Sequence, residues 1–165
     1  MCGIVGVVGL QDCAETLLDS LKRLEYRGYD SSGIVTRTDD GFAMNRAVGK
    51  LSALSATMRE NPLAGHSGLG HTRWATHGGV SERNAHPHIA GEKVAIVHNG
   101  IIENHAVLRD ELRAAGHEFA SETDSEVLAL SLIHISEPTR QAEMGDSGVL
   151  VEKKRGGGGG GGGGG

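Results

Sequence analysis

The sequence lacks an excess of basic residues and has few aromatic ones. Its 16 Lys and Arg residues are outnumbered by 21 Asp and Glu residues, which gives a formal net charge of −5, and aromatic residues make up only 3% of the chain. A protein that binds nucleic acid needs a basic surface to neutralise phosphates. We therefore expect no nucleic-acid partner, and a small polar substrate fits this composition better.

Long hydrophobic runs are also missing. The apolar opening segment, residues 2–10, is far too short to cross a bilayer, no Lys or Arg precedes it, and no small-residue cleavage site follows it. We expect no membrane partner and a cytoplasmic protein. In a reducing cytoplasm the two cysteines, Cys2 and Cys13, remain thiols, which leaves Cys2 free to react.

Hydrophobic periodicity predicts several strands interleaved with helices. Strands are expected at residues 2–9, 32–37, 42–48, 70–74 and 93–98, and helices at residues 14–25, 51–59, 104–115 and from about 124 onward. Asp39, Asp40 and Gly41 are typical of a hairpin turn between the second and third strands. The polar stretch 76–88 is predicted to be a loop, and loops on a rigid scaffold often carry function. The pattern favours a layered α/β or α+β sandwich over a doubly wound sheet.

The sequence changes character at Leu130. Residues 130–140 read LSLIHISEPTR, which matches a translated sequencing adapter residue for residue, and residues 156–165 are an unbroken run of glycine. We interpret residues 130–165 as a non-native tail. A natural helix extension followed by a flexible glycine linker is the alternative. On our interpretation, residues 1–129 are a partial domain.

The strongest chemical feature is the start of the chain, Met1-Cys2-Gly3. A small second residue permits removal of the initiator methionine, and Cys2 then carries both a thiol and the α-amine. An α-amine with a pKa of about 7.7–8.0 can accept the proton of a thiol whose reference pKa is about 8.5. Cys2 is therefore a candidate nucleophile, and the alternative is an apolar cysteine buried in a strand.

A second group of polar residues follows the predicted strand at 70–74. Arg73 is suited to a two-point grip on a carboxylate, although a minor surface ion pair is its alternative role. Trp74, the only tryptophan, lies near the Gly78-Gly79 pair, which favours a mobile lid over a core position.

Two further candidates lie at the ends of predicted elements. Asn99 and Gly100 follow a strand, where a side-chain amide and an unhindered backbone N–H can form an oxyanion hole, and an ordinary Asn-Gly turn is the alternative. Asp124 lies at a helix start, where it can cap the helix or bind an ammonium group. Thr123 and Glu126 have the spacing of a capping box at the same place.

Together these residues resemble the ordered motifs of the N-terminal-nucleophile glutamine amidotransferases. The motifs span nearly all of residues 1–130 and are Cys2-Gly3-Ile4-Val5-Gly6, Arg27-Gly28, Thr72-Arg73-Trp74-Ala75-Thr76, His98-Asn99-Gly100 and Ser121-Glu122-Thr123-Asp124. Within that superfamily, residues 24–31 and 71–78 are similar to the enzymes that make glucosamine 6-phosphate. The phosphoribosyl-pyrophosphate amidotransferases and the asparagine synthetases are the alternatives. The resemblance implies an α+β fold, a four-layer αββα sandwich of the N-terminal-nucleophile hydrolase type, here incomplete.

The resemblance also implies the chemistry. Cys2 attacks the side-chain amide of glutamine, and Asn99 with the Gly100 N–H stabilises the tetrahedral intermediate. A γ-glutamyl thioester and ammonia result, and no cofactor is needed.

Substrate binding is implied in the same way. Arg73, Thr76 and His77 hold the α-carboxylate of glutamine, Asp124 holds its α-ammonium, and Trp74 lies on the loop that closes over it. In the parent enzyme, a homodimer, the ammonia then reaches fructose 6-phosphate in a C-terminal isomerase domain that this chain lacks.

Two rival readings remain open. His71, His77 and the segment His86-Pro87-His88 could suggest zinc, but their spacing matches no common zinc signature, and we expect no metal. The second rival is a truncated gene fragment that does not fold, because missing strands leave open sheet edges.

Overall fold

The structure is a computed structural model that describes residues 2–9 and 12–136. The chain divides into two units, residues 1–133 and residues 134–165. The described helices and strands lie in the first unit, apart from the last turn of α4 (Glu126–Ser136). From residue 137 onward, the predicted non-native tail lies outside the described residues.

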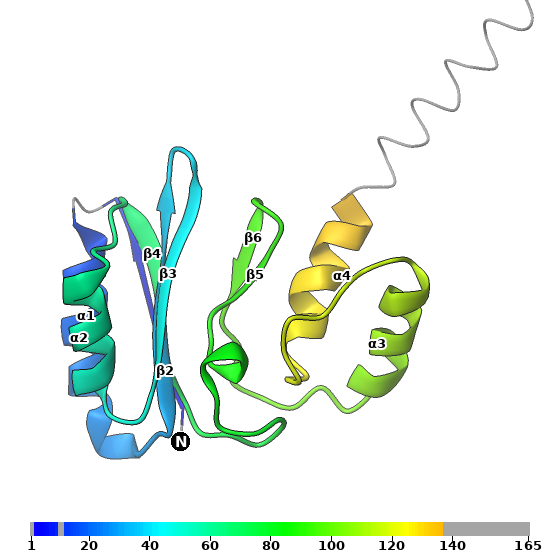
Figure 1. Cartoon of the computed structure of the whole chain (residues 1–165), viewed down its shortest axis with the longest axis horizontal. Helices are drawn as coiled ribbons and strands as arrows, with labels where there is room; N and C mark the ends of the chain where they lie inside the picture. Colours follow the sequence, from blue (N-terminus) through cyan, green and yellow to red (C-terminus); the bar gives the residue numbers. More distant parts are fainter. Residues whose placement is uncertain (1, 10–11, 137–165) are drawn as a thin grey trace, which may run out of the picture. The chain divides into compact units, whose positions relative to one another are not determined.

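An antiparallel sheet of four strands forms the centre of the N-terminal half (Figure 1). Its strands, in spatial order, are β1 (Gly3–Val8), β4 (Ser67–Arg73), β2 (Ser31–Thr38) and β3 (Gly41–Val48). The predicted hairpin is confirmed, because β2 and β3 pair in antiparallel register from Ser31 opposite Val48 to Thr38 opposite Gly41. β4 begins three residues earlier than the periodicity predicted.

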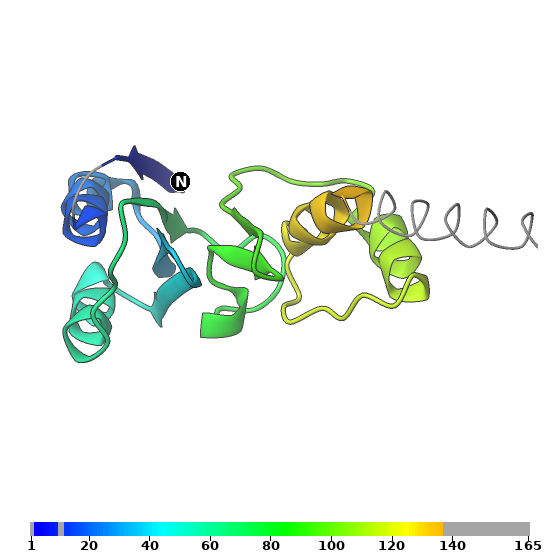
Figure 2. The same cartoon turned by 90° about the horizontal axis from the view of Figure 1, so that it is seen from above.

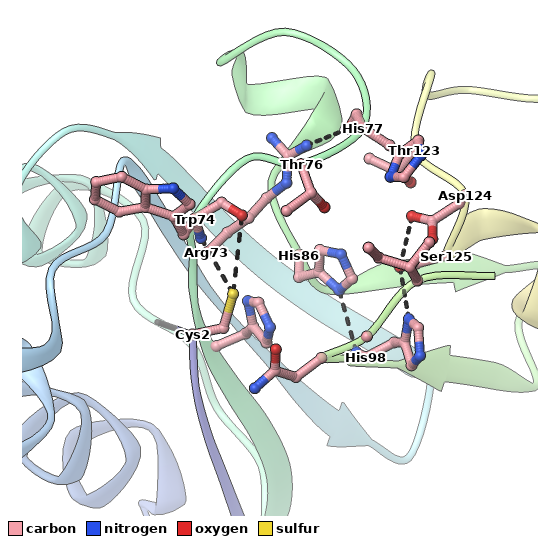
Figure 3. A pocket seen from close by; sticks show the side chains of 14 residues that line it. Cys2, Arg73, Trp74, Thr76, His77, His86, His98, Thr123, Asp124 and Ser125 are labelled. Atoms are coloured by element: carbon pink, nitrogen blue, oxygen red, sulfur yellow. Dashed lines mark hydrogen bonds between the residues drawn. The ribbon is translucent and has the colours of Figure 1, made fainter. Parts of the chain in front are cut away.

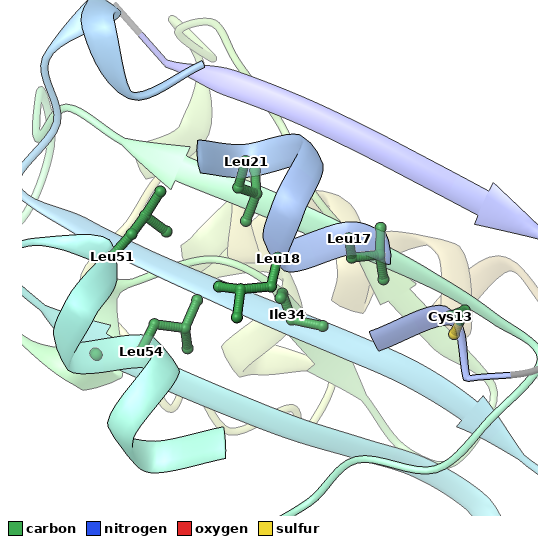
Figure 4. Packing of buried hydrophobic residues seen from close by; sticks show 8 residues of the cluster. Cys13, Leu17, Leu18, Leu21, Ile34, Leu51 and Leu54 are labelled. Carbon is green, nitrogen blue, oxygen red and sulfur yellow. The ribbon is translucent and has the colours of Figure 1, made fainter. Parts of the chain in front are cut away.

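Helices α1 (Cys13–Arg23) and α2 (Leu51–Glu60) cover one face of this sheet. Leu17, Leu18 and Leu21 recur at helical spacing on α1 and are buried against the sheet residue Ile34 (Figure 4). Leu24, which lies inside the helix predicted at residues 14–25, follows the end of α1 and is only partly buried. A short 3₁₀ turn, η1 (Glu25–Arg27), comes next.

The second half of the described chain forms a smaller sheet with two helices. β5 (His88–Ala90) pairs antiparallel with β6 (Val94–Ile96), and α3 (His105–Ala114) and α4 (Glu126–Ser136) follow. The predicted loop 76–88 contains a 3₁₀ turn, η2 (Glu82–Asn84), and ends where β5 begins. Sequence periodicity missed β5 because a three-residue strand is too short to show an alternating pattern.

The two sheets lie face to face between the two pairs of helices, as Figures 1 and 2 show. Gly33 on β2 lies close to the segment before β5, because a Cβ there would lie 2.2 Å from the carbonyl oxygen of His86. Nearby, the Arg46 guanidinium on β3 donates to the carbonyls of Arg83 and Ala85 at 3.3 and 3.2 Å. The order of layers is the αββα order that we expected of this α+β fold.

Helix α4 crosses the position at which the sequence changes character. Ala129 and Ile133 on α4 are buried against Ala90 of β5, and Leu130 packs at the edge of the same cluster. Residues 130–136 are thus helical, and their interpretation as non-native stays a prediction. Among residues 2–9 and 12–136, no helix is long and apolar enough to cross a membrane.

Candidate active site

A cavity of about 250 Å³ lies where both sheets meet the loop after β4. All eight residues singled out from the sequence line it: Cys2, Arg73, Trp74, Thr76, His77, Asn99, Gly100 and Asp124. Six further lining residues were not singled out as site residues: His71, His86, His98, Ile101, Thr123 and Ser125. The structure therefore brings together residues that are up to 122 positions apart, from Cys2 to Asp124.

Cys2 lies just before β1, next to the end of β4. The pairing of β1 with β4 places Gly3 opposite Thr72, and the Gly3 N–H donates to the Thr72 hydroxyl at 2.9 Å. This register brings the Trp74 N–H to 3.2 Å from the Cys2 Sγ (Figure 3). Cys2 is half-buried, so its sulfur is accessible from the cavity.

Arg73 fixes the loop that follows β4. Its side chain is only 4% exposed, and Nη2 donates to the carbonyls of His77 and, at 3.4 Å, of Gly78. Nη1 donates to the Gly79 carbonyl at 3.4 Å. In this structure the guanidinium thus binds loop carbonyls, and the predicted grip on a substrate carboxylate stays a prediction.

The same loop carries the remaining predicted binding residues. Thr76 and His77 face the cavity, and the His77 ring lies edge-on to the His105 ring at 5.1 Å between centroids. Trp74 is 55% exposed, so it is not a core residue. The Ala75 N–H donates to the carboxylate of Asp30, which ties the start of the loop to the start of β2.

Asn99 and Gly100 follow β6 and are both exposed at the cavity. The imidazole of His98 lies directly against Gly100, where a Cβ would be 2.9 Å from its Nε2. His98 is held in turn by Ser125, whose Oγ lies 3.0 Å from the ring Nδ1. The turn after β6 is therefore fastened to the segment that precedes α4, which also carries Asp124.

Asp124 is buried, with 4% of its surface exposed. Its carboxylate accepts the Ile102 N–H at 2.8 Å and the Ser125 hydroxyl at 3.4 Å. Asp124 therefore ties the Ile102 segment to the start of α4, and both of its carboxylate oxygens already have a donor.

The predicted capping box at the start of α4 is wrong. The Glu126 carboxylate accepts the N–H groups of Ala120 and Ser121 at 2.8 and 2.7 Å and does not bond to the Thr123 N–H. The Thr123 N–H points instead to the Ser121 hydroxyl at 3.3 Å. The reason is that α4 begins only at Glu126, so this glutamate is not in the third helical position, and its carboxylate accepts N–H groups five and six residues earlier.

Three buried histidines lie close together, and two of them, His71 and His86, line the cavity. The rings of His71 and His86 stack at 4.4 Å between centroids, and the His88 ring meets the His86 ring edge-on at 4.5 Å. Burial lowers the pKa of His71 to about 4 and that of His88 to about 3, and it also lowers the pKa of His86. All three are neutral at pH 7. In the described part of the chain, no group of three or more His, Cys, Asp or Glu side chains could hold a metal ion.

Sequence reasoning had considered these histidines only as possible zinc ligands. The sequence does contain an indication that two of these rings are neighbours, because His86 and His88 are two residues apart. Alternate positions along an extended segment lie on the same side of the backbone, which predicts neighbouring rings.

Residues 55–146 match the family model of the glutamine amidotransferase domain. The chain belongs to this family. It is 60% identical over 129 residues to a glutamine–fructose-6-phosphate aminotransferase (isomerizing) of Rhizobium meliloti, covering 78% of the chain and 21% of the relative. The corresponding enzyme of Thermus thermophilus is 51% identical over 145 residues, covering 87% of the chain and 23% of the relative. The chain spans about a fifth of the length of these curated relatives.

Solved structures of the same fold support the architecture. A glutamine phosphoribosylpyrophosphate amidotransferase from B. subtilis superposes with a TM-score of 0.66 at 24% identity, covering 79% of the chain and 28% of its own length. An allosteric regulatory enzyme of purine biosynthesis gives a TM-score of 0.67 at 26% identity, covering 78% and 28%. The predicted N-terminal-nucleophile amidotransferase fold is confirmed.

Proposed function

We propose that this domain hydrolyses glutamine to glutamate and ammonia through a thioester on Cys2. The observation that carries the proposal is that one cavity holds the Cys2 sulfur together with amide, guanidinium, imidazole and carboxylate side chains. Family membership supports the same substrate, because the matched family is a glutamine amidotransferase domain.

In the proposed reaction, the free α-amine of Cys2 takes the thiol proton, and the sulfur attacks the γ-amide carbon of glutamine. Asn99 and the Gly100 N–H donate to the oxygen that becomes negative in the tetrahedral intermediate. The carbon–nitrogen bond then breaks, the ammonium of Cys2 returns its proton to the leaving nitrogen, and ammonia departs. Water attacks the thioester next, which releases glutamate and restores the thiol.

Arg73, Thr76 and His77 are proposed to bind the α-carboxylate of glutamine, and Asp124 its α-ammonium. In this proposal the α-carboxylate of glutamine replaces the loop carbonyls that now accept hydrogen bonds from Arg73. The exchange is favourable because a carboxylate accepts more strongly from a guanidinium than a carbonyl does. Their exchange for substrate would rearrange the loop, which carries Trp74 at its exposed edge.

For the whole protein we propose transfer of the ammonia to fructose 6-phosphate, giving glucosamine 6-phosphate in a C-terminal isomerase domain. The support is the identity of 60% and 51% to two enzymes named for that substrate. The phosphoribosylpyrophosphate alternative has weaker support, at 24% identity. We further propose a homodimer formed through the isomerase domain, and a cytoplasmic setting in which both free cysteines stay reduced.

Labelling of Cys2 tests the glutaminase proposal. In the full-length protein, in which residues 1–129 continue in their natural reading frame, intact mass should show loss of Met1. A glutamine-analogue electrophile should modify Cys2 and spare Cys13, which is buried and whose pKa is raised by that burial. Cys2→Ser should abolish most glutamate release. Modification of Cys13 with Cys2 untouched would contradict the proposal.

We also propose that residues 130–165 are not part of the natural domain. The family match runs to residue 146, which supports the alternative of a natural extension and makes a direct test necessary. Glutamate release should be compared for the chain as given, for residues 1–129, and for residues 1–129 completed by the natural downstream frame. We expect activity only from the third, because site residues must be held within fractions of an ångström. If the chain as given releases glutamate as fast as the completed domain, then residues 130–165 are not a non-native tail and residues 1–129 are not an incomplete domain.

A further inference from the structure

A buried asparagine connects two of the segments that line the cavity. Asn84, the last residue of η2, is only 1% exposed and is not among the described side chains that line the cavity. Its Nδ2 donates to the Gly79 carbonyl at 3.0 Å and to the Glu122 carboxylate at 3.1 Å. Its Oδ1 accepts the Glu122 N–H at 2.9 Å. One side chain thus bonds to the loop after β4 and to the segment before α4.

The chemistry of these bonds requires an amide. Two donors and one acceptor are used at once, which an asparagine supplies and which neither aspartate nor alanine can. The site is also tightly packed, because a Cβ at Gly78 would lie 2.9 Å from the Asn84 Nδ2 and 3.2 Å from the Glu122 Cβ. Gly78 has a φ of 76°, in the left-handed region that glycine adopts without strain. The loop therefore lies directly on the Asn84 amide.

Each of the two connected segments is fixed separately to its own part of the fold. Arg73, at the end of β4, holds the loop by donating to the carbonyls of His77 and Gly79. Arg109 on α3 holds the other segment by donating to the carbonyls of Ser121 and Thr123 at 3.0 and 2.7 Å. Asn84 is hydrogen-bonded to both segments, so it constrains the distance between the loop after β4 and the segment before α4.

That distance matters for an α-amino acid, because its carboxylate and its ammonium group are attached to the same carbon. The loop carries Thr76 and His77, and the other segment carries Asp124. We propose that Asn84 is a positioning residue that sets the separation between the carboxylate-binding loop and the ammonium-binding aspartate. The inference rests on the proposed function. It means that a residue outside the cavity affects how tightly the α-carboxylate and α-ammonium of glutamine are bound.

The test uses two electrophiles on the full-length protein. A diazo ketone analogue of glutamine carries the α-carboxylate and α-ammonium, whereas iodoacetamide carries neither. Asn84→Asp and Asn84→Ala should each raise the analogue concentration that gives half-maximal Cys2 labelling by about tenfold or more, because a buried hydrogen-bond network is broken. The rate of alkylation by iodoacetamide should stay within about twofold, because the sulfur and its Trp74 donor are unaffected.

Asn45→Ala is the matched control. Asn45 is also buried, at 7% exposed, and its amide donates to the Asn61 carbonyl at 2.7 Å, away from the cavity. This substitution should lower the melting temperature and leave half-maximal labelling unchanged. Glu122→Ala removes one of the three bonds of Asn84 at an exposed residue and should raise the half-maximal concentration by about threefold.

The outcomes separate the two claims. Normal labelling of the wild-type protein with unchanged half-maximal concentrations in the Asn84 variants would overturn the positioning role alone. Equal losses with both electrophiles, or the same loss in Asn45→Ala, would also overturn it, because the effect would then be general. If neither Asn84 variant folds, an unchanged value for Glu122→Ala would overturn it. Absence of analogue labelling in the wild-type protein would refute the proposed function and the inference together.

Discussion

Replacing Arg73 with lysine keeps the positive charge but removes the planar fork of the guanidinium. Nη1 and Nη2 of Arg73 donate to loop carbonyls in this structure, and in the proposed complex both donate to the α-carboxylate of glutamine. A single ammonium group can take only one of these two positions. The lost hydrogen bond from a charged group contributes about 1.5–3 kcal/mol. Since about 1.4 kcal/mol corresponds to tenfold in affinity, KM for glutamine should rise by about 10- to 100-fold. The fall in kcat should be much smaller, because Arg73 does not contact the reacting amide in the proposed complex.

Steady-state glutamate release by the full-length protein measures this split. Arg46→Lys is the control, because Arg46 also donates to two backbone carbonyls but lies outside the cavity. It should lower the melting temperature and leave KM unchanged. If Arg73→Lys lowers kcat as much as it raises KM, or if Arg46→Lys raises KM equally, Arg73 does not bind the substrate in the way proposed.

Three further outcomes are expected. Asn99→Ala should lower kcat by about 10²-fold and change KM little, measured as glutamate release; the opposite pattern would move Asn99 out of the oxyanion hole. Gly33→Ala should destabilise the fold by about 1–3 kcal/mol in denaturant titration, because its Cβ would lie 2.2 Å from the His86 carbonyl oxygen, and unchanged stability would contradict the close approach of the sheets. The pKa of His71 is about 4 and that of His88 about 3, below the unfolded value of about 6.5, so the unfolded chain binds more protons. The melting temperature should therefore fall as pH drops from about 6.5 toward 4, and His71→Asn should reduce the slope.

Periodicity predicted most elements of the fold because their packing is local and repetitive. Leu17, Leu18 and Leu21 show the helical face of α1 directly, and the polar turn at Asp39 and Asp40 separates β2 from β3 as expected. The strand β5 was not predicted because three residues are too few to show an alternating pattern of apolar and polar side chains. The capping box failed for a different reason: Thr123 and Glu126 have the right spacing, but spacing alone does not say which N–H groups lie nearest to the carboxylate.

The residues singled out from the sequence line one cavity, whereas the contacts among the residues around that cavity were not predictable. Residue type and position at element ends made Cys2, Asn99 and Asp124 candidates, and the family resemblance supplied their proposed roles. All three line the cavity. The attachment of Asn84 to Glu122 joins residues 38 positions apart, and nothing in the local sequence of either predicts it. Such contacts depend on how the layers meet, which propensity and periodicity do not encode.

The position of the cavity links catalysis to the packing of the two sheets. Cys2 and Arg73 lie at the start of β1 and at the end of β4 in the four-stranded sheet, whereas Asn99 follows β6 of the second sheet and Asp124 precedes α4. A shift of one sheet against the other would therefore separate the nucleophile from the groups proposed to stabilise the oxyanion and to bind the ammonium. Because cores resist continuous deformation, the close contact at Gly33 holds this spacing as well as the fold. A variant that loosens it should lose glutaminase activity at temperatures where the protein is still folded.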